Sequence, residues 1–331
     1  MKKFSVLLLI GLMILSSCAS DKGEKRSTGG VKPKSTGKLG EMVVVMPESW
    51  WQDTAGAAFR YYFESEYPGL PQVESRFTVV HIPPSAYNRL FKTHRNLVLV
   101  EQEDSAAIGY EYNRFASGQL VMGIEASNPA ELAQLLRESG LEAAKKFSDA
   151  EVNRLNRAHK LVKTNDAYSD LRALGLEVTV PNDFRLNLIE EDFIWFFRDK
   201  RKVTQGILIY IGDVLPDVGM EDAIIAARDS ATLRVEGERP GTFMRVEKIY
   251  APMVQATEAQ GRFAMETRGL WKMENDYMGG SFINKTIWDE ANDRTVSIDG
   301  FVYAPGEDKR NYMMELEAIV ESLRFVLTED Q

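Results

Sequence analysis

A single cysteine constrains this chain more than any other feature. Cys18 is the only cysteine among 331 residues, so no intramolecular disulfide can hold the fold together. Apolar packing and polar contacts must do so instead. Cys18 also follows directly on an apolar run, Val6–Leu15, which begins after the positive residues Lys2 and Lys3. Positive charge, apolar core and small residues are the three parts of a secretory signal, which predicts that residues 1–17 are removed.

The residues around the expected cleavage point indicate the kind of signal. The tetrad Leu15-Ser16-Ser17-Cys18 resembles the lipobox of bacterial lipoproteins, in which the cysteine sulfur is acylated and becomes the first residue. A membrane-spanning helix is disfavoured, since it needs about 20 apolar residues and this run has about a dozen. An ordinary signal peptide beside a free thiol is the alternative. We expect lipidation at Cys18 and a cell-envelope location, with the outer membrane favoured over the inner.

The segment after Cys18 differs in charge from the rest of the chain. Removing residues 1–17 takes away two lysines and changes the net charge from −9 to −11. Residues 19–40 contain six basic and two acidic residues, so the remaining body carries about −15. The low apolar content of residues 18–40 predicts a lipidated cysteine followed by a flexible basic tether. Nucleic acid is excluded as a partner of the acidic body, because it requires clustered positive charge.

The remaining residues predict an α+β protein with two domains, mainly antiparallel sheets and flanking helices. We place the N-terminal domain at 41–174 and the C-terminal domain at 175–331. A long helical segment separates them; it starts at Asn128 as N-cap with Pro129 in the first position and continues, with interruptions, to about Leu174.

Turn residues between alternating apolar runs predict two hairpins. The first joins 108–115 to 119–125 around Ser117-Gly118, and the second joins 282–288 to 295–303. Lys309–Phe325 is predicted as a terminal helix, because its apolar residues recur with helical spacing.

No residue pattern supports catalysis or cofactor binding. The three histidines are not spaced as a metal pair, and no phosphate-binding or nucleophile-elbow motif occurs. The run Asp289 to Asp293 favours a polar turn over a calcium loop, because Ala291 stands where an oxygen ligand is needed. The acidic run Glu190 to Asp192 favours a solvated loop. We therefore assign no catalytic residue, no metal and no cofactor.

Two segments are candidates for binding. Arginine and aromatic side chains beside glycines suit anions or carbohydrates, although a packed structural hairpin is the simpler interpretation. The candidate binding surface comprises Arg268, Trp271, Gly279, Gly280, Phe282, Tyr303 and Arg310. The secondary candidate is His94-Arg95-Asn96, in a loop before a strand.

The same segments carry a family resemblance. The lipobox, the strand opening at Gly40–Met46, Leu70-Pro71-Gln72, His94-Arg95-Asn96, Arg268-Gly269-Leu270-Trp271, Met278–Phe282 and Gly300–Arg310 together resemble an uncharacterised family of Bacteroidetes-type envelope lipoproteins with a domain of unknown function. That family supplies no catalytic residues. The C-terminal half also resembles, more weakly, the PsbP-like fold, whose members are often non-enzymatic accessory subunits.

These observations favour a membrane-anchored lipoprotein that acts as a binding or accessory protein, with an envelope protein or polymer as partner. One alternative is an envelope hydrolase acting on glycans or peptides, which needs two converging carboxylates or His94 beside a hydroxyl. The other is a small-ligand carrier, which needs an enclosed apolar cavity.

Overall fold

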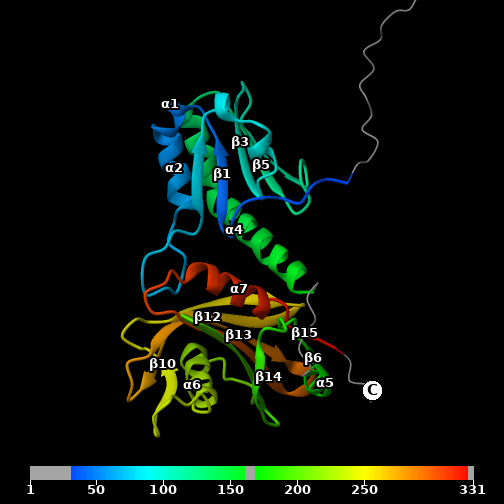
Figure 1. The fold of residues 1–331 in the computed structure, drawn as a ribbon, viewed down its shortest axis with the longest axis vertical. Coiled ribbons are helices and arrows are strands. Elements are labelled where there is room, and N and C mark those ends of the chain that lie inside the picture. The colour runs from blue at the N-terminus through cyan, green and yellow to red at the C-terminus, as the bar shows by residue number, and fades with distance from the viewer. Residues whose placement is uncertain (1–30, 161–167, 327–331) are drawn as a thin grey trace, which may run out of the picture. The chain divides into compact units, whose positions relative to one another are not determined.

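The computed structural model describes residues 31–160 and 168–326, so the predicted signal peptide and Cys18 lie outside the described residues. The chain divides into two units, residues 1–32 and 33–331. The three sheets of the described residues all belong to the unit that starts at Pro33 (Figure 1). We call residues 41–160 the N-terminal half and residues 168–326 the C-terminal half.

A five-stranded mixed sheet forms the centre of the N-terminal half. Its strand order is β2-β1-β3-β5-β4. The strands are β1 (Glu41–Val45), β2 (Thr78–Ile82), β3 (Asn96–Gln102), β4 (Ala107–Tyr112) and β5 (Leu120–Ala126). β1 pairs in parallel with β2 and β3, β3 pairs in parallel with β5, and only β4 and β5 are antiparallel.

The α+β class is confirmed, and so is the hairpin of β4 and β5, but the pairing in this sheet is not mainly antiparallel. Parallel neighbours need crossover connections. Here helices α1 (Glu48–Trp51) and α2 (Thr54–Phe63) connect β1 to β2, and the short helices η1 (Pro84–Ala86) and α3 (Arg89–Lys92) connect β2 to β3. These helices are too short or too irregular to identify as crossovers from their sequence alone.

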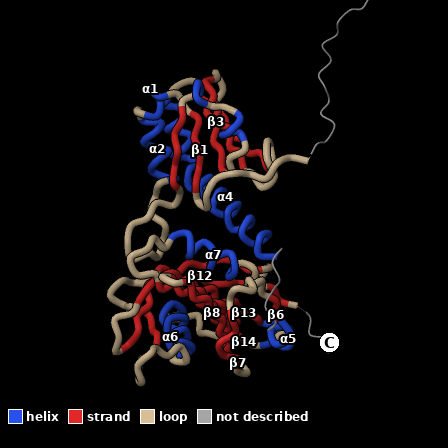
Figure 2. Tube along the Cα trace, in the orientation of Figure 1, coloured by secondary structure: helices blue, strands red, loops and turns tan. Residues whose placement is uncertain are grey.

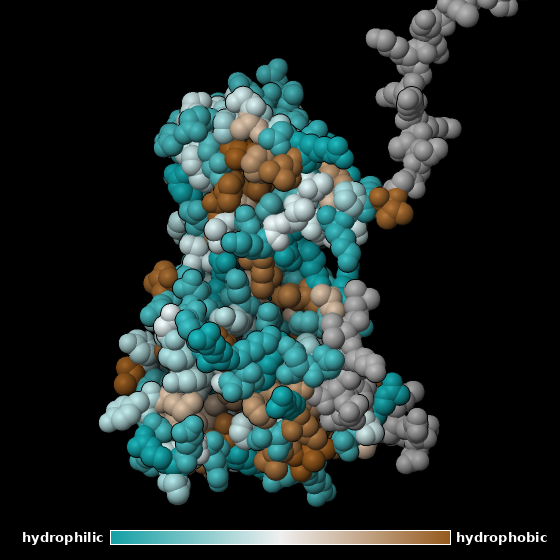
Figure 3. Space-filling view, in the orientation of Figure 1, coloured by the Kyte–Doolittle hydropathy of each residue, from teal (hydrophilic) through white to brown (hydrophobic). Residues whose placement is uncertain are grey.

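Helices cover one face of this sheet, and α3 with its neighbours covers the other. Phe59 and Phe63 of α2 and Phe147 of α4 (Pro129–Lys160) are fully buried in the core on the first face. Asn128 accepts a hydrogen bond from the Glu131 amide at 3.0 Å, which confirms the predicted cap of α4. On the other face Val43, Leu97 and Val121 form a smaller core. Figure 3 shows apolar side chains gathered on the visible face of this half.

The C-terminal half contains an eight-stranded antiparallel sheet (Figure 2). Its order is β10-β12-β13-β14-β9-β8-β7, and β11 also pairs with β12. The strands are β7 (Arg185–Ile189), β8 (Phe193–Lys200), β9 (Val203–Gly212), β10 (Phe243–Val246), β11 (Met253–Ala259), β12 (Arg262–Glu274), β13 (Gly279–Asp289) and β14 (Arg294–Tyr303). The predicted second hairpin is confirmed as β13 and β14, joined by the short helix η2 (Glu290–Asn292).

One helix packs on each face of this sheet. Apolar residues of α7 (Arg310–Val320), among them Met313 and Leu316, join the larger core on one face. Ala231 of α6 (Met220–Thr232) joins the core on the other face. Leu155 of α4 packs against the larger core, so the N-terminal half contributes to it directly.

Two boundaries differ from the prediction. The predicted terminal helix ends at Val320, and Arg324–Phe325 form strand β15, which pairs with β6 (Leu176–Glu177). Only the distant β6 makes this pairing possible, so local spacing does not reveal it. The helical segment predicted from Pro129 to about Leu174, with interruptions, agrees with the described helices α4 and α5 (Tyr168–Ala173).

The second difference concerns the tether. Residues 33–40 lie against the N-terminal half, whereas the sequence predicts flexibility through residue 40. The Ser35 amide donates to the Ser117 carbonyl at 3.0 Å, and the Thr36 amide donates to the Thr93 carbonyl at 2.9 Å. Backbone hydrogen bonds of this kind are invisible in composition, because any side chains can accompany them.

A buried ion pair lies between α6 and the sheet. Arg228 donates from Nε to Asp299 at 2.7 Å, and both side chains are essentially inaccessible. The guanidinium also stacks over the ring of Phe282, 3.7 Å from its centroid. Burial raises the pKa of Asp299, although Arg228 opposes this shift. The pair therefore depends on both partners being present.

Removing the cation of this pair should destabilise the fold strongly. Arg228→Met leaves Asp299 buried without its partner, and we expect a loss of about 3–5 kcal/mol in unfolding free energy. The double variant Arg228→Met/Asp299→Leu should recover part of this loss, because neither charge remains. Urea unfolding measures both. Lys145→Met, which breaks an exposed pair with Asp149, serves as control and should cost less than about 0.5 kcal/mol. A similar small cost for Arg228→Met would contradict the prediction.

Candidate functional site

All residues of the candidate binding surface except Arg310 lie on strands β12, β13 and β14, and two of its aromatic side chains are buried. Trp271 is 2% exposed and Phe282 is fully buried. Both belong to the core on the α6 face, against which Tyr303 also packs. The Trp271 indole N–H donates to the Val302 carbonyl at 3.2 Å, and its ring meets that of Phe301 edge-on with centroids 5.6 Å apart. In this structure these side chains pack a hairpin, and ligand binding by them stays a prediction.

The two glycines of this segment allow close packing of the strands. Gly280 lies opposite Trp271 in the ladder. A Cβ atom at Gly280 would overlap the carbonyl oxygen of Val302, and one at Gly279 would press on the carbonyl oxygen of Trp271. The groups that lie close to these two glycines are therefore backbone carbonyls of the neighbouring strands β14 and β12.

Arg268 lies in a buried polar cluster that joins three separate parts of the chain. Its Nε donates to Glu266 on the same strand at 2.7 Å, and its Nη2 lies 3.0 Å from Glu317 of α7. Its Nη1 donates to the Tyr67 hydroxyl at 3.3 Å, and that hydroxyl donates to Glu317 at 2.6 Å. Arg268 is 8% exposed. We call these four residues, Tyr67, Glu266, Arg268 and Glu317, the Arg268 cluster.

The charges of the Arg268 cluster are mutually dependent. Burial by itself raises the pKa of Glu317, but the Arg268 guanidinium and the Tyr67 hydroxyl outweigh it and hold the pKa below its usual value. Burial and the nearby Glu317 carboxylate raise the pKa of Tyr67, so the phenol stays protonated and can donate. Every charged member thus has a fixed partner, which is the arrangement that makes buried charge tolerable.

Arg310 of α7 is the last member of the predicted surface. It contacts the 64–77 loop of the N-terminal half, which also contains Tyr67. Its Nη1 donates to the Ser75 carbonyl at 2.8 Å and to the Thr78 hydroxyl at 3.2 Å. Glu74 accepts from the Lys309 and Arg310 amides at 2.7 and 2.9 Å. A carboxylate at a helix N-terminus satisfies free amides and interacts well with the helix dipole, so Glu74 holds the 64–77 loop on α7.

Two of the three secondary candidates, Arg95 and Asn96, contact the same residue, Glu151 of α4. Arg95 Nη2 lies 2.6 Å from the Glu151 carboxylate, and Asn96 Nδ2 donates to it at 2.7 Å. Arg154 lies 3.2 Å from it, and the Gly40 amide donates to it at 3.3 Å. Glu151 is fully buried. The cluster therefore fixes α4 against the start of β1 and β3.

His94 borders this cluster without joining it. Its Nδ1 lies 3.2 Å from the Asn96 carbonyl, and its Nε2 is 3.8 Å from Glu41. Burial lowers the pKa of His94, an effect that the Asn96 carbonyl and Glu41 partly offset. The ring is 6% exposed and packs beneath Gly37, where a Cβ would overlap it. A hydroxyl partner for nucleophilic chemistry is not among its described contacts.

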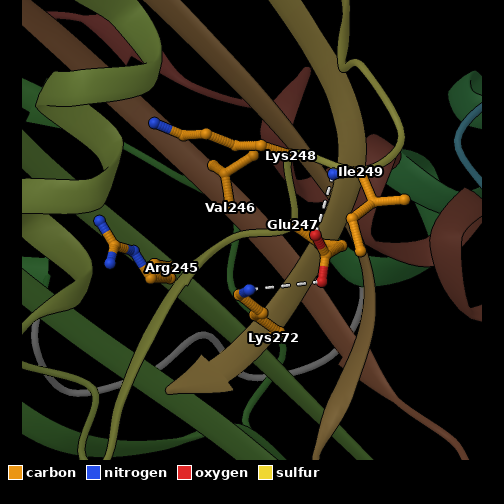
Figure 4. Close-up of a pocket in the computed structure, with 6 residues that line it drawn as sticks. All are labelled: Arg245, Val246, Glu247, Lys248, Ile249 and Lys272. Carbon is orange, nitrogen blue, oxygen red and sulfur yellow. Dashed lines mark hydrogen bonds and ion pairs between the residues drawn. The ribbon is translucent and has the colours of Figure 1, made fainter.

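An open, charged pocket lies beside β10 and β12. Its cavity volume is about 470 Å³, and its lining residues are Arg245, Val246, Glu247, Lys248, Ile249 and Lys272 (Figure 4). Lys272 Nζ lies 3.6 Å from Glu247, and Lys248 Nζ lies 3.6 Å from Asp229. Ile249 is 81% exposed. Paired charges beside an exposed apolar residue suit a protein contact better than a small anion.

A second pocket of about 460 Å³ lies where β13 meets η2, with Arg262, Asp289 and Arg294 in its lining. Asp289 accepts from Arg294 at 2.8 Å and from Asn292 at 2.7 Å. Asp289 to Asp293 thus form a polar turn, as predicted. Among residues 31–160 and 168–326, no group of three or more His, Cys, Asp or Glu side chains is placed to hold a metal ion.

Sequence reasoning missed the buried charges, although a signal for them exists. Glu151 follows Phe147 by four residues, Arg228 follows Ile224 by four, and Glu317 follows Met313 by four. Five of the six are buried, and the Glu317 side chain is 18% exposed. A charged residue in the apolar stripe of a helix faces the core and needs a buried partner. The partners themselves come from distant segments.

Two models of protein domains match separate parts of the chain. Residues 35–160 match a domain of unknown function (DUF8532), and residues 165–322 match another (DUF4837). No curated protein matches the chain. The chain is thus an α+β protein, and two parts of it match domains whose function is unknown.

Several solved structures are similar to part of the chain. The Saccharomyces cerevisiae Ran-binding protein Mog1p is 11% identical, with 46% of this chain and 90% of that chain covered and a TM-score of 0.31. Mycobacterium tuberculosis LpqN, involved in cell envelope biogenesis, is 14% identical, with 46% and 83% covered and a TM-score of 0.29. The lipid transfer and protein localization domain of human StarD13 (DLC2) is 10% identical, with 42% and 88% covered and a TM-score of 0.22.

Adding one methyl group at Gly280 should test the strand packing. Gly280→Ala forces the new Cβ into the Val302 carbonyl, and we expect a loss of about 3 kcal/mol, at the upper end for overpacked sites. The matched control is Gly123→Ala, in strand β5, where no atom lies within 4 Å of the added Cβ. The control should change the unfolding free energy by less than about 1 kcal/mol. Equal urea midpoints for the two variants would argue against the close approach.

The Arg268 cluster should make stability depend on acid pH. A carboxyl whose pKa is lowered by folding stabilises the fold above its unfolded pKa, and this contribution is lost as pH falls through the folded pKa. Glu317→Gln should therefore reduce the unfolding free energy near neutral pH by about 3–5 kcal/mol. The difference in unfolding free energy between this variant and the unmodified chain should disappear as the pH falls below 4.5, the usual pKa of a glutamate. Urea unfolding across this range measures it.

The control for this experiment is an exposed carboxylate. Glu111 pairs with Arg114 at 3.0 Å but is 59% exposed, so Glu111→Gln should cost less than about 0.5 kcal/mol at any pH. A Glu317 variant whose deficit stays constant from neutral to acid pH would show that ionisation of Glu317 does not stabilise the cluster.

Proposed function

We propose that this protein is a lipid-anchored protein of the bacterial cell envelope that binds a partner and has no catalytic activity. The observation that carries the proposal is the tetrad Leu15-Ser16-Ser17-Cys18 directly after an apolar core. Small residues before a cysteine are what a lipoprotein signal requires at its cleavage point. The expected location is the outer membrane rather than the inner one.

The unit that starts at Pro33 fits this anchoring. Residues 19–32 separate Cys18 from it, and a flexible coil of that length spans roughly 20 Å root-mean-square. The body is therefore held close to the lipid surface. Within the described ranges, each helix is too short or too polar to span a bilayer, and the proposal assigns membrane attachment to the acyl chains of Cys18.

The environments of the buried carboxylates favour a binding role over hydrolysis. Glu151, Asp299 and Glu317 each lie within ion-pair distance of an arginine. A hydrolase needs one carboxyl with a raised pKa beside a second group that can act on the same substrate. The pKa of Asp299 is raised by burial, but its side chain is inaccessible to a substrate. Even in the acidic loop, Glu190 and Asp192 share Arg234, at 2.8 and 3.0 Å.

Exposed apolar residues next to the charged pocket support a protein partner. Ile249, Tyr250 and Met253 are 81%, 65% and 48% exposed. They occupy a short segment next to Lys248, which lines the pocket. Exposed apolar side chains with charged residues at the rim are typical of interaction sites, and here they support partner binding by the C-terminal half.

Lipid attachment can be tested at Cys18 directly. Cells that express the full chain and are fed a labelled fatty acid should yield a labelled protein in the membrane fraction. Cys18→Ala should abolish the label and release most of the protein from the membrane, because no other cysteine can accept the lipid. Ser16→Ala keeps a small residue beside the cleavage point and should leave both unchanged. Unlabelled protein that stays with the membrane in every variant would overturn the anchor.

A further inference from the structure

The chain enters the folded unit at one edge of the N-terminal half. Residues 33–36 run beside the segment that ends at Arg95 and beside the loop between β4 and β5 (Figure 1). The Ser117 amide donates to the Pro33 carbonyl at 2.7 Å, and the Arg95 amide donates to the Thr36 carbonyl at 2.8 Å. The segment that carries the proposed anchor is therefore joined to the body at this point.

Basic side chains gather around this point. Arg89 and Lys92 are exposed on the short helix α3, and Lys34 and Arg114 are exposed on the two adjoining segments. The Gln119 amide group donates to the Lys92 carbonyl at 2.7 Å, which holds α3 next to the β4–β5 loop. Arg89, Lys92 and Arg114 belong to residues 41–331, whose net charge is about −15, and Lys34 lies just before them. The local charge is therefore opposite to that of the body as a whole.

Aromatic and apolar side chains accompany the cations. Lys92 Nζ lies 5.7 Å from the ring centroid of Tyr87 and 5.9 Å from that of Phe115. The Arg114 guanidinium lies 5.0 Å from the centroid of Phe115. Leu90, between the two cations of α3, is 71% exposed. We call Lys34, Arg89, Leu90, Lys92, Arg114 and Phe115 the exit surface.

The chemistry of the exit surface matches that of a lipid headgroup layer. Lysine and arginine near a membrane are attracted by anionic headgroups, and aromatic rings prefer the interfacial depth. An exposed leucine flanked by cations can enter the acyl boundary while its neighbours stay with the phosphates. One carboxylate, Glu111, lies 3.0 Å from Arg114, which leaves Lys34, Arg89 and Lys92 to supply the positive charge.

We propose that the exit surface lies on the membrane that holds the Cys18 anchor and binds its anionic phospholipid headgroups. This inference rests on the proposed lipid anchor, because the short tether raises the effective concentration of the exit surface at the bilayer. A contact that is weak in free solution is then sufficient to orient the body. The charged pocket beside β10 belongs to the other half and stays available to a partner.

Vesicle sedimentation tests the proposal without the lipid anchor. The chain from Ala19 is used, because the residues removed lie outside the unit that starts at Pro33. It should sediment with phosphatidylethanolamine vesicles that contain phosphatidylglycerol, and binding should weaken with added salt. Arg89→Glu/Lys92→Glu should lower the partition coefficient at least about tenfold, given the usual contribution of each basic residue near an anionic surface.

A matched charge reversal on the C-terminal half is the control. Arg185 and Arg201 are both exposed there, so Arg185→Glu/Arg201→Glu changes the net charge equally and should leave vesicle binding within about twofold. Equal losses in the two double variants would show that only net charge matters and would overturn the proposal. So would the absence of binding to anionic vesicles by the chain from Ala19.

A tryptophan probe gives a second, independent readout. Leu90→Trp adds an indole at a position that is already exposed, so folding should be preserved. The emission of the added indole is obtained by subtracting the spectrum of the unmodified chain. This emission should shift to shorter wavelength with anionic vesicles and not with vesicles of phosphatidylcholine alone. Tyr277→Trp, at a fully exposed position of the C-terminal half, should show no shift. An unshifted Leu90→Trp spectrum would overturn the contact, whereas lipid labelling of Cys18 in cells reports separately on the anchor.

Discussion

The contact among Tyr67, Arg268 and Glu317 unites the two halves of the folded unit. Tyr67 and Glu317 are 250 positions apart in the chain, so closing this contact costs much chain entropy. The cost is offset because the hydroxyl, the guanidinium and the carboxylate satisfy one another in a site with little water. Once the contact is made, Glu74 reaches the first amides of α7. The position of the 64–77 loop, and with it the approach of the two sheets, depends on this cluster.

The same principle recurs at the other buried charges. Glu151 fixes α4 on the start of β3, and the pair of Arg228 with Asp299 fixes α6 on the C-terminal sheet. A helix displaced by one turn would leave each of these charges buried without a partner, which costs several kcal/mol. The ion pairs therefore select one position of each helix among several that apolar packing alone would allow. Arg268 belongs to this set, which explains why an arginine among aromatic residues need not mark a binding surface.

The proposed anchor and the exit surface give an acidic body a defined orientation. Repulsion by anionic lipids would turn such a body away from the membrane, but the four cations beside Pro33 lie where the tether enters. Anionic lipids would attract the four cations and repel the rest of the body. Within the Debye length of the membrane surface, these two forces together would turn the exit surface toward the membrane. The pocket that contains Lys248 and the exposed Ile249 would then be free to meet a partner.

The sequence by itself determined the periodic and local features of this protein. Alternation around Ser117-Gly118 and around Asp289–Arg294 was sufficient for both hairpins, and Asn128 with Pro129 was sufficient for the start of α4, because turns and caps depend on neighbouring residues. The α+β class followed from the same patterns. Only the tertiary structure decided the parallel pairing of β1 and β3, the strand at Arg324–Phe325 and the attachment of residues 33–40. Each of these uses backbone hydrogen bonds between distant segments, which no side-chain pattern records. The burial of Arg268 was decided in the same way, since its partner Tyr67 is 201 positions away.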